Sequence, residues 1–152
     1  MKNNKGFSLV ELIIVIAIMA VLVGVLAPTY LQYVEKSKKS NDVSTVDSVI
    51  NALEIAAIDP EVNSEAWTHI DVKINTSGMT VSPDTPGAAI EKAFKEIVGT
   101  DIKFKSAKWG GDVCIRATNG TNGKITLAYH DTTNNKGNTA FQAYATSLTK
   151  IS

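Results

Sequence analysis

The sequence has a single cysteine, Cys114, and two histidines, His69 and His130, among its 152 residues. One cysteine cannot form a disulfide within the chain, so the fold must be held by its core, by packing against neighbours or by bound ions. The two histidines are far apart and follow no zinc-binding spacing. No Ser/His/Asp arrangement is recognisable, and Cys114 fits a small buried strand residue better than a reactive nucleophile. We therefore expect neither an enzyme nor a cofactor.

Charge is also missing from a long stretch near the N-terminus. No charged residue occurs from Leu12 through Val34, and the apolar run of roughly 20 residues there is long enough to span a bilayer. No Ala-x-Ala cleavage site follows the run, which argues against an ordinary secretory signal. Lys2 and Lys5 precede it and predict a cytoplasmic N-terminus with an exported C-terminal region.

One carboxylate, Glu11, stands at the start of this apolar run. A charge inside a membrane helix costs on the order of a few kcal/mol or more, so Glu11 needs a partner. Cleavage after Gly6 would create one, because the new α-amine of Phe7 is a cation that could pair with Glu11 of a neighbouring copy. The pattern predicts a precursor that is cut and then assembled. The blander interpretation is a stray acid at a helix start, stabilised by the helix dipole.

The other charged residues do not indicate a particular binding partner. Formal net charge is zero, and removing Lys2 and Lys5 lowers the 15 basic residues to 13 against 15 acidic ones. A chain this close to neutral gives no general case for binding nucleic acid. Lys36, Lys38 and Lys39 fit a solvated helix face, and contact with DNA or with an acidic patch of a neighbour is the sharper alternative.

Hydrophobic periodicity predicts one long helix from Phe7 to about Ile58. Its first half is apolar all round, and Pro28 should kink or locally melt it, unless the membrane helix simply ends there. Beyond Tyr33 the helix becomes amphipathic, and Asp42 falls among the residues assigned to its polar side. The positions that share the apolar face recur at three- and four-residue steps: Val43, Val46, Val49, Ile50, Leu53 and Ala57.

The remainder predicts a small antiparallel sheet. Residues 61–86 read as irregular apart from a short strand at residues 70–74, and a short amphipathic helix follows and ends at Gly99. Three period-two runs, at residues 102–107, 113–118 and 125–130, predict an antiparallel meander with one apolar face. The apolar segment at residues 140–144 is a candidate to dock on this sheet. The fold class is α+β, with a long kinked N-terminal helix packed by its C-terminal half on the sheet.

Gly6-Phe7-x-x-x-Glu11 heading an uncharged apolar helix, with Pro28, an amphipathic continuation and a late sheet, resembles the type IV pilins and their pseudopilin relatives. The motif-level resemblance covers Lys5 to about Tyr33. It implies a leader at residues 1–6, an apolar transmembrane and filament-core half-helix at residues 7–33, and a globular region at residues 34–152. The short leader and the Phe at the cleavage site look like the type IVa subgroup.

The resemblance also implies roles for single residues. Gly6 would precede the bond cut by a prepilin peptidase, and Phe7 would become the N-methylated first residue. Glu11 would neutralise the terminal amine of an adjacent subunit, and Pro28 would be the helix-breaking proline of the family. The partners implied are further copies in a helical filament, the peptidase, the cytoplasmic membrane and the pilus assembly machinery. The final location implied is an extracellular pilus.

Several alternatives stay open. The implied function is a pilus subunit for adhesion, motility or DNA uptake, against a pseudopilin of a type II secretion or competence system. The alternative of another class is a monomeric, membrane-anchored binding domain with an uncleaved leader. Some pseudopilins bind calcium at loop edges, which makes Asp112 and Asp131 weak calcium candidates. Tyr30 and Tyr33 fit an interfacial aromatic pair.

Overall fold

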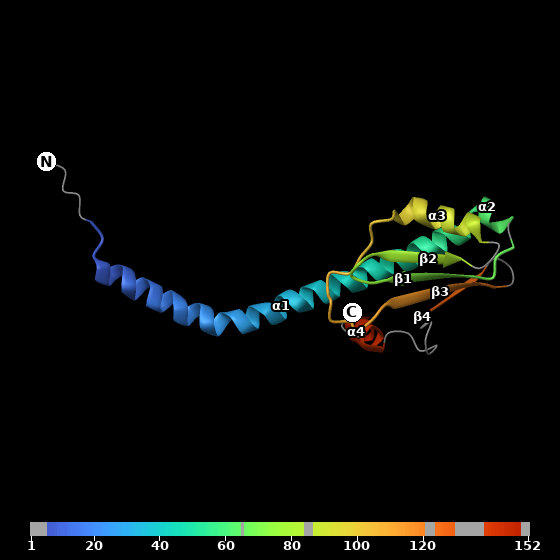
Figure 1. Cartoon of the computed structure of the whole chain (residues 1–152). Helices are drawn as coiled ribbons and strands as arrows, with labels where there is room; N and C mark the ends of the chain where they lie inside the picture. Colours follow the sequence, from blue (N-terminus) through green and yellow to red (C-terminus); the bar gives the residue numbers. More distant parts are fainter. Residues whose placement is uncertain (1–5, 65, 84–86, 121–123, 130–138, 150–152) are drawn as a thin grey trace. The chain divides into compact units, whose positions relative to one another are not determined.

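The computed structural model describes residues 6–64, 66–83, 87–120, 124–129 and 139–149. The chain divides into two compact units, Met1–Ser37, which we call the N-terminal unit, and Lys38–Ser152, which we call the head. Helix α1 (Leu9–Ala57) contributes to both units (Figure 1). The expectation of one long helix is confirmed, and the helix does not end at Pro28, which lies inside it.

The head part of α1 buries one stripe of side chains. Val46, Val49 and Leu53 are fully buried, and they fall at the three- and four-residue steps that place side chains on one helix face. The helix ends at Ala57, just before the Asp59-Pro60 pair. There the short helix α2 (Pro60–Asn63) begins, with the Asp59 carboxylate accepting a hydrogen bond of 2.8 Å from the Glu61 amide.

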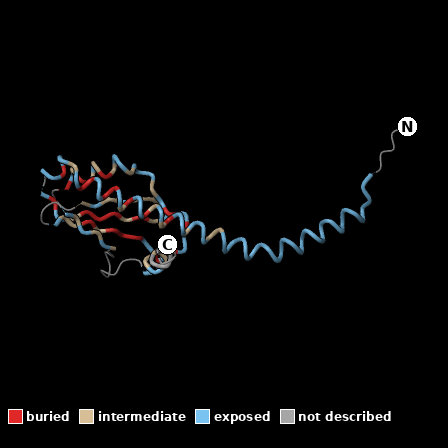
Figure 2. Tube along the Cα trace, turned by 180° about the vertical axis from the view of Figure 1, so that it is seen from behind, coloured by how far each residue is buried: buried red, intermediate tan, exposed pale blue. Residues whose placement is uncertain are grey.

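Four antiparallel strands form one sheet in the order β2-β1-β3-β4 (Figure 1). Their bounds are His69–Ile74 for β1, Met79–Pro83 for β2, Val113–Asn119 for β3 and Ile125–Tyr129 for β4. In the register, Val72 of β1 lies between Val81 of β2 and Ile115 of β3, and Ala117 of β3 lies beside Leu127 of β4. The apolar side chains of β1 and β3 join the buried residues of α1 in one core (Figure 2).

The expectation that residues 61–86 are irregular outside one strand is wrong. They hold α2 and both strands of the β1–β2 hairpin. Asn75 builds the turn, since its side-chain oxygen accepts hydrogen bonds from the amides of Ser77 and Gly78 at 2.8 and 3.0 Å. The sequence pattern did not predict β2, because the strand presents only Met79 and Val81 to the core side and ends in a proline. An edge strand tolerates this proline.

The predicted strand at residues 102–107 is also wrong, and β1 takes its place beside β3. The segment alternates in sequence like a strand, but its amides go elsewhere. The amides of Lys105 and Ser106 both donate to the side chain of Asp42. Two successive amides of a strand point to opposite sides, so a segment that aims both at one carboxylate cannot form a ladder. The predicted meander therefore reduces to β3 and β4.

Two further helices close the core of the head. Helix α3 (Ala88–Val98) buries Ile90 and Phe94 and is followed by Gly99 with a φ of 79°, the left-handed conformation that glycine adopts easily. Helix α4 (Thr139–Thr149) buries Phe141 completely. The ring of Phe141 lies 5.9 Å from that of Tyr129 on β4, measured between centroids, so the expected docking of residues 140–144 on the sheet is confirmed.

Candidate assembly site

The N-terminal unit begins with a helix cap that involves Glu11. Its Oε2 atom accepts a hydrogen bond of 2.9 Å from the Ser8 amide, and the Ser8 hydroxyl accepts a longer one of 3.4 Å from the Val10 amide. A serine at the cap and a glutamate three residues later form a capping box, which satisfies amides that the first turn leaves open. Glu11 therefore has a structural role within its own chain, as the blander interpretation of this residue requires.

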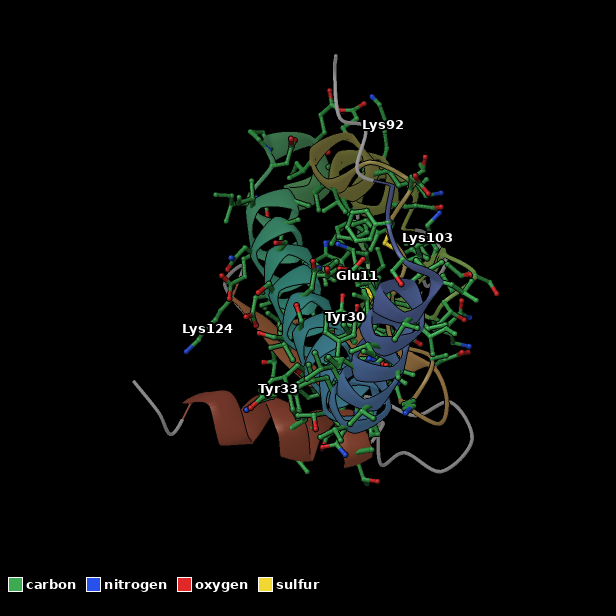
Figure 3. All side chains as sticks on the ribbon, turned by 90° about the vertical axis from the view of Figure 1, so that its left-hand side faces the viewer. Glu11, Tyr30, Tyr33, Lys92, Lys103 and Lys124 are labelled. Atoms are coloured by element: carbon green, nitrogen blue, oxygen red, sulfur yellow. The ribbon has the colours of Figure 1, made fainter. Side chains whose placement is uncertain are left out.

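The cap leaves part of the Glu11 carboxylate available. Only Oε2 accepts a hydrogen bond from the residues that the structure describes. Glu11 is exposed in the single chain, and Figure 3 shows it beside the ribbon of α1. A carboxylate has two oxygens with roughly four acceptor positions. Glu11 can therefore hold its own helix start and still receive a cation from outside.

The side chains that follow Glu11 are apolar and exposed. Phe7 is 86% exposed, and the large apolar residues from Leu9 to Leu31 are exposed around the whole helix. By its length and composition, α1 is the one helix in the described part of the chain that could cross a membrane. Tyr30 and Tyr33 stand at the C-terminal end of this apolar stretch and are exposed as well (Figure 3). Exposed apolar area of this extent needs a lipid or protein environment.

The predicted cleavage point lies in a segment without helical structure. Gly6 and Phe7 are exposed and precede the first helical residue, Leu9. A peptidase needs an accessible backbone, and both residues are exposed and lie outside the helix. Pro28 lies inside helical backbone in the single chain. The kink or melting expected there stays a prediction.

Asp42 is buried within the head, although the sequence analysis assigned it to the polar side of the helix. Its side chain is fully buried and accepts three hydrogen bonds. The Lys105 amide donates to Oδ1 at 2.7 Å, and the Ser106 amide and Trp109 Nε1 donate to Oδ2 at 3.0 and 2.8 Å. The loop between α3 and β3 is thereby fixed to α1. A usable signal existed, because Asp42 lies four residues before Val46 and so on the buried stripe.

The other candidate residues do not gather into a site. Asp112 accepts a hydrogen bond of 3.1 Å from the Asn75 side-chain amide, and Asp131 lies outside the described residues. No group of three or more His, Cys, Asp or Glu residues that could hold a metal ion occurs in the described ranges. Cys114 is buried in β3, in register with Lys73 of β1. Calcium binding at Asp112 stays an untested expectation.

The chain is similar to known fimbrial proteins. Residues 1–27 match the family described as the prokaryotic N-terminal methylation motif. A type IV major fimbrial protein of Dichelobacter nodosus is 33% identical over 135 residues, which cover 72% of this chain and 82% of that relative. A fimbrial protein of Pseudomonas aeruginosa is 37% identical over 59 residues, 39% of this chain and 38% of its own length.

A third relative is the type IV wide pilus major component of Thermus thermophilus. It is 31% identical over 83 residues, 55% of this chain and 60% of the relative. No solved structure matched the chain. The match to the methylation motif includes Gly6, Phe7 and Glu11, and the first relative is matched over most of its length. Together with the long helix packed on a four-stranded antiparallel sheet, these similarities show that the chain belongs to the type IV pilins, structural subunits that form filaments and are not enzymes.

Proposed function

We propose that this pilin is made as a membrane-anchored precursor, cut between Gly6 and Phe7, methylated at Phe7, and built into a pilus on the cell surface. The observation that carries the proposal is the N-terminal half of α1, which is apolar and exposed on all sides and holds one carboxylate. On this proposal the leader is residues 1–6, the filament-core half-helix residues 7–33 and the globular region residues 34–152. The division of the chain after Ser37 supports the last boundary.

The apolar half of α1 would be covered first by lipid and then by the half-helices of neighbouring subunits. Before assembly, a bilayer covers it, because a stretch of roughly 20 apolar residues matches the hydrocarbon thickness. In the filament, the same half-helices of neighbouring subunits would cover one another. A prepilin peptidase and a pilus assembly machinery would connect the two states. The pilus would serve adhesion, motility or DNA uptake.

Glu11 provides the selective contact of the assembled state. Cleavage after Gly6 would turn the Phe7 nitrogen into a cation, and methylation keeps it cationic. A buried carboxylate and a buried amine each carry a large desolvation cost, which their pairing offsets only with good geometry. Since Oε2 of Glu11 is held by the Ser8 amide, the carboxylate is already oriented before a neighbour arrives. The amine of an adjacent subunit would then bind the remaining oxygen.

The first test is the intact mass of the protein in filaments sheared from native cells. A mass that begins at Phe7 and carries one methyl group, in abundant sheared material, is the expected result. The processed form in the membrane fraction alone would favour a pseudopilin. A chain that still carries its leader would contradict the proposal and favour a monomeric anchored domain.

A matched pair of variants tests the role of Glu11. Glu11→Gln keeps an acceptor for the Ser8 amide but removes the charge, so the helix cap survives while the pairing does not. We expect the variant to accumulate in the membrane and to yield at most about a tenth of the wild-type filament, a tenfold loss being about 1.4 kcal/mol. Glu54→Gln is the control, because Glu54 is an exposed carboxylate on the head part of the same helix. Normal filament yield from Glu11→Gln would refute the pairing.

A further inference from the structure

Four lysines gather at the end of the head where α1 enters it. Lys38 and Lys39 belong to the first residues of the head, whereas Lys105 and Lys108 belong to the loop between α3 and β3. The loop crosses α1 at this end of the head (Figure 1). We call these four residues the basic end. Lys38, Lys105 and Lys108 are exposed, and Lys39 is half-buried.

Uncharged side chains contact two of the four lysines of the basic end. The Lys105 ammonium donates to the Asn41 side-chain oxygen at 2.7 Å, and the Lys39 ammonium lies 4.8 Å from the centre of the Trp109 ring. Glu35 and Asp42 are the carboxylates nearest in sequence to Lys38 and Lys39; Glu35 is half-buried, and the buried Asp42 already accepts three hydrogen bonds from the loop. In the described part of the chain, no carboxylate forms an ion pair with any of the four lysines.

The surrounding charge makes the basic end distinct. Lys103 on the same loop is balanced by Asp101, whose carboxylate lies 3.6 Å from its ammonium. Asp112 is the other exposed acid of this loop and is hydrogen-bonded to Asn75. By contrast, residues 43–100 contain nine acidic and three basic residues. Positive charge is therefore concentrated at one end of an otherwise acidic head.

The basic end begins close in sequence to the uncharged stretch of the chain. Lys38 follows Val34, the last residue of the uncharged stretch, by four positions. Four residues span at most about 14 Å of fully extended chain and about 6 Å of helix. Lys105 contacts Asn41 and Asp42 directly, and the Lys108 amide donates to the hydroxyl of Ser106, whose own amide donates to Asp42. A membrane that surrounds the apolar stretch therefore has its headgroups only a few residues away from Lys38 along the chain.

We propose that the basic end docks the head on anionic lipid headgroups of the membrane that holds the unassembled subunit. This inference rests on the membrane-anchored precursor in the proposed function. A lysine near an anionic bilayer surface changes the binding equilibrium by about fivefold, and the effect fades within a Debye length. The docked state would fix the orientation of the head before assembly and would be released when the apolar half-helix leaves the bilayer.

The experiment uses the full chain in vesicles, with a fluorophore on Ala107→Cys. Ala107 is exposed between Lys105 and Lys108, and the native Cys114 is buried. A lipid with a nitroxide headgroup quenches the fluorophore when the loop lies on the surface. Vesicles of phosphatidylcholine alone are compared with vesicles that also contain phosphatidylglycerol, at low and high salt. We expect stronger quenching with phosphatidylglycerol, and weaker quenching when salt is added.

Two triple variants separate position from net charge. Lys38→Gln, Lys105→Gln and Lys108→Gln together should lower the ratio of docked to undocked heads by roughly 100-fold. Lys39 is kept because it packs on Trp109. The control replaces Lys73, Lys92 and Lys124 by glutamine, which removes the same charge elsewhere; Figure 3 shows Lys92 at the top and Lys124 at the lower left of the view. The control should quench like the parent chain.

The outcomes distinguish this inference from the proposed function. A chain that floats with both kinds of vesicle but shows no dependence on phosphatidylglycerol overturns the docking and leaves the anchored precursor intact. A chain that does not float with vesicles overturns the anchored precursor and the docking together. Quenching that follows protein density in phosphatidylcholine alone, with cross-links between copies, would assign the basic end to the acidic surface of a second copy and overturn the lipid proposal.

Discussion

Replacing Asp42 by alanine removes the acceptor that ties the loop between α3 and β3 to α1. The carboxylate is fully buried, and its three donors are the amides of Lys105 and Ser106 and the indole nitrogen of Trp109. The donors come from residues more than sixty positions away in the sequence, so the carboxylate closes a long-range contact. Alanine would leave all three donors in the interior with no acceptor.

The size of the effect follows from those donors. A buried donor that loses its partner costs about 1–3 kcal/mol, which sets a range of about 3–9 kcal/mol for three. Water entering the vacated space reduces this, and single substitutions above about 4–5 kcal/mol are exceptional. We therefore expect Asp42→Ala to lower the free energy of unfolding by about 3–5 kcal/mol. Asp42→Asn should cost about 2 kcal/mol, because its oxygen can serve two donors while its amide group faces the third.

The assay is urea unfolding of the full chain in non-ionic detergent, followed by tryptophan emission and far-UV circular dichroism. Trp109 is a direct partner of Asp42, so its emission reports the detachment of the loop. Asp47→Ala is the matched control, because Asp47 lies on the same helix but is exposed. It should change stability by at most about 0.5 kcal/mol. An Asp42→Ala variant as stable as this control would refute the reasoning.

Three further predictions concern the head. Phe141→Ala should cost about 3–5 kcal/mol in the same unfolding assay, since its fully buried ring packs on those of Phe104 and Trp109; an unchanged midpoint would show that α4 does not close the core. Arg116→Met should cost about 1–3 kcal/mol and Arg116→Lys less, because the guanidinium binds both oxygens of Asp71 at 2.7 Å and lysine cannot reproduce the fork; equal losses would contradict this. Burial, with a smaller effect of the Asp47 charge, raises the pKa of Tyr129 above its ordinary value of 10.0. The folded chain thus holds this proton more tightly than the unfolded chain, so its contribution to stability is complete below about pH 10 and is lost as pH rises through the raised pKa; Tyr129→Phe should remove that loss in alkaline unfolding curves.

The residues of the candidate assembly site could be proposed from the sequence because they lie within a short stretch. Gly6, Phe7 and Glu11 fall within six consecutive positions, and their meaning depends on the uncharged run that follows. The capping contact between Glu11 and Ser8 is also local, since Ser8 caps α1 and Glu11 lies in its first turn. Local spacing was sufficient here because these positions are close neighbours along the chain at the start of one helix.

The long-range contacts of the head were predicted less well. Residues 102–107 alternate in the same way as β3 and β4, yet their amides bind Asp42 and they form no strand. Strand β2 carries a weak pattern but is held at the sheet edge by its pairing with β1. Strand periodicity reports which side chains can face a core and not which backbone partners are available. Asp42 was misplaced for the same reason, because its donors come from a distant loop.

The sequence by itself determined the long helix, its apolar N-terminal half, the lone carboxylate at its start and the amphipathic stripe that enters the core. These features depend on neighbours three or four residues apart, for which helix geometry supplies the contact. Only the tertiary structure decided that β1 pairs with β3, that the loop at residues 99–112 is fastened to α1 by Asp42, and that Lys105 and Lys108 join Lys38 and Lys39 at one end of the head. The physical reason is that backbone amides and buried charges take whichever partner the completed core brings near, and these partners lie far apart along the chain.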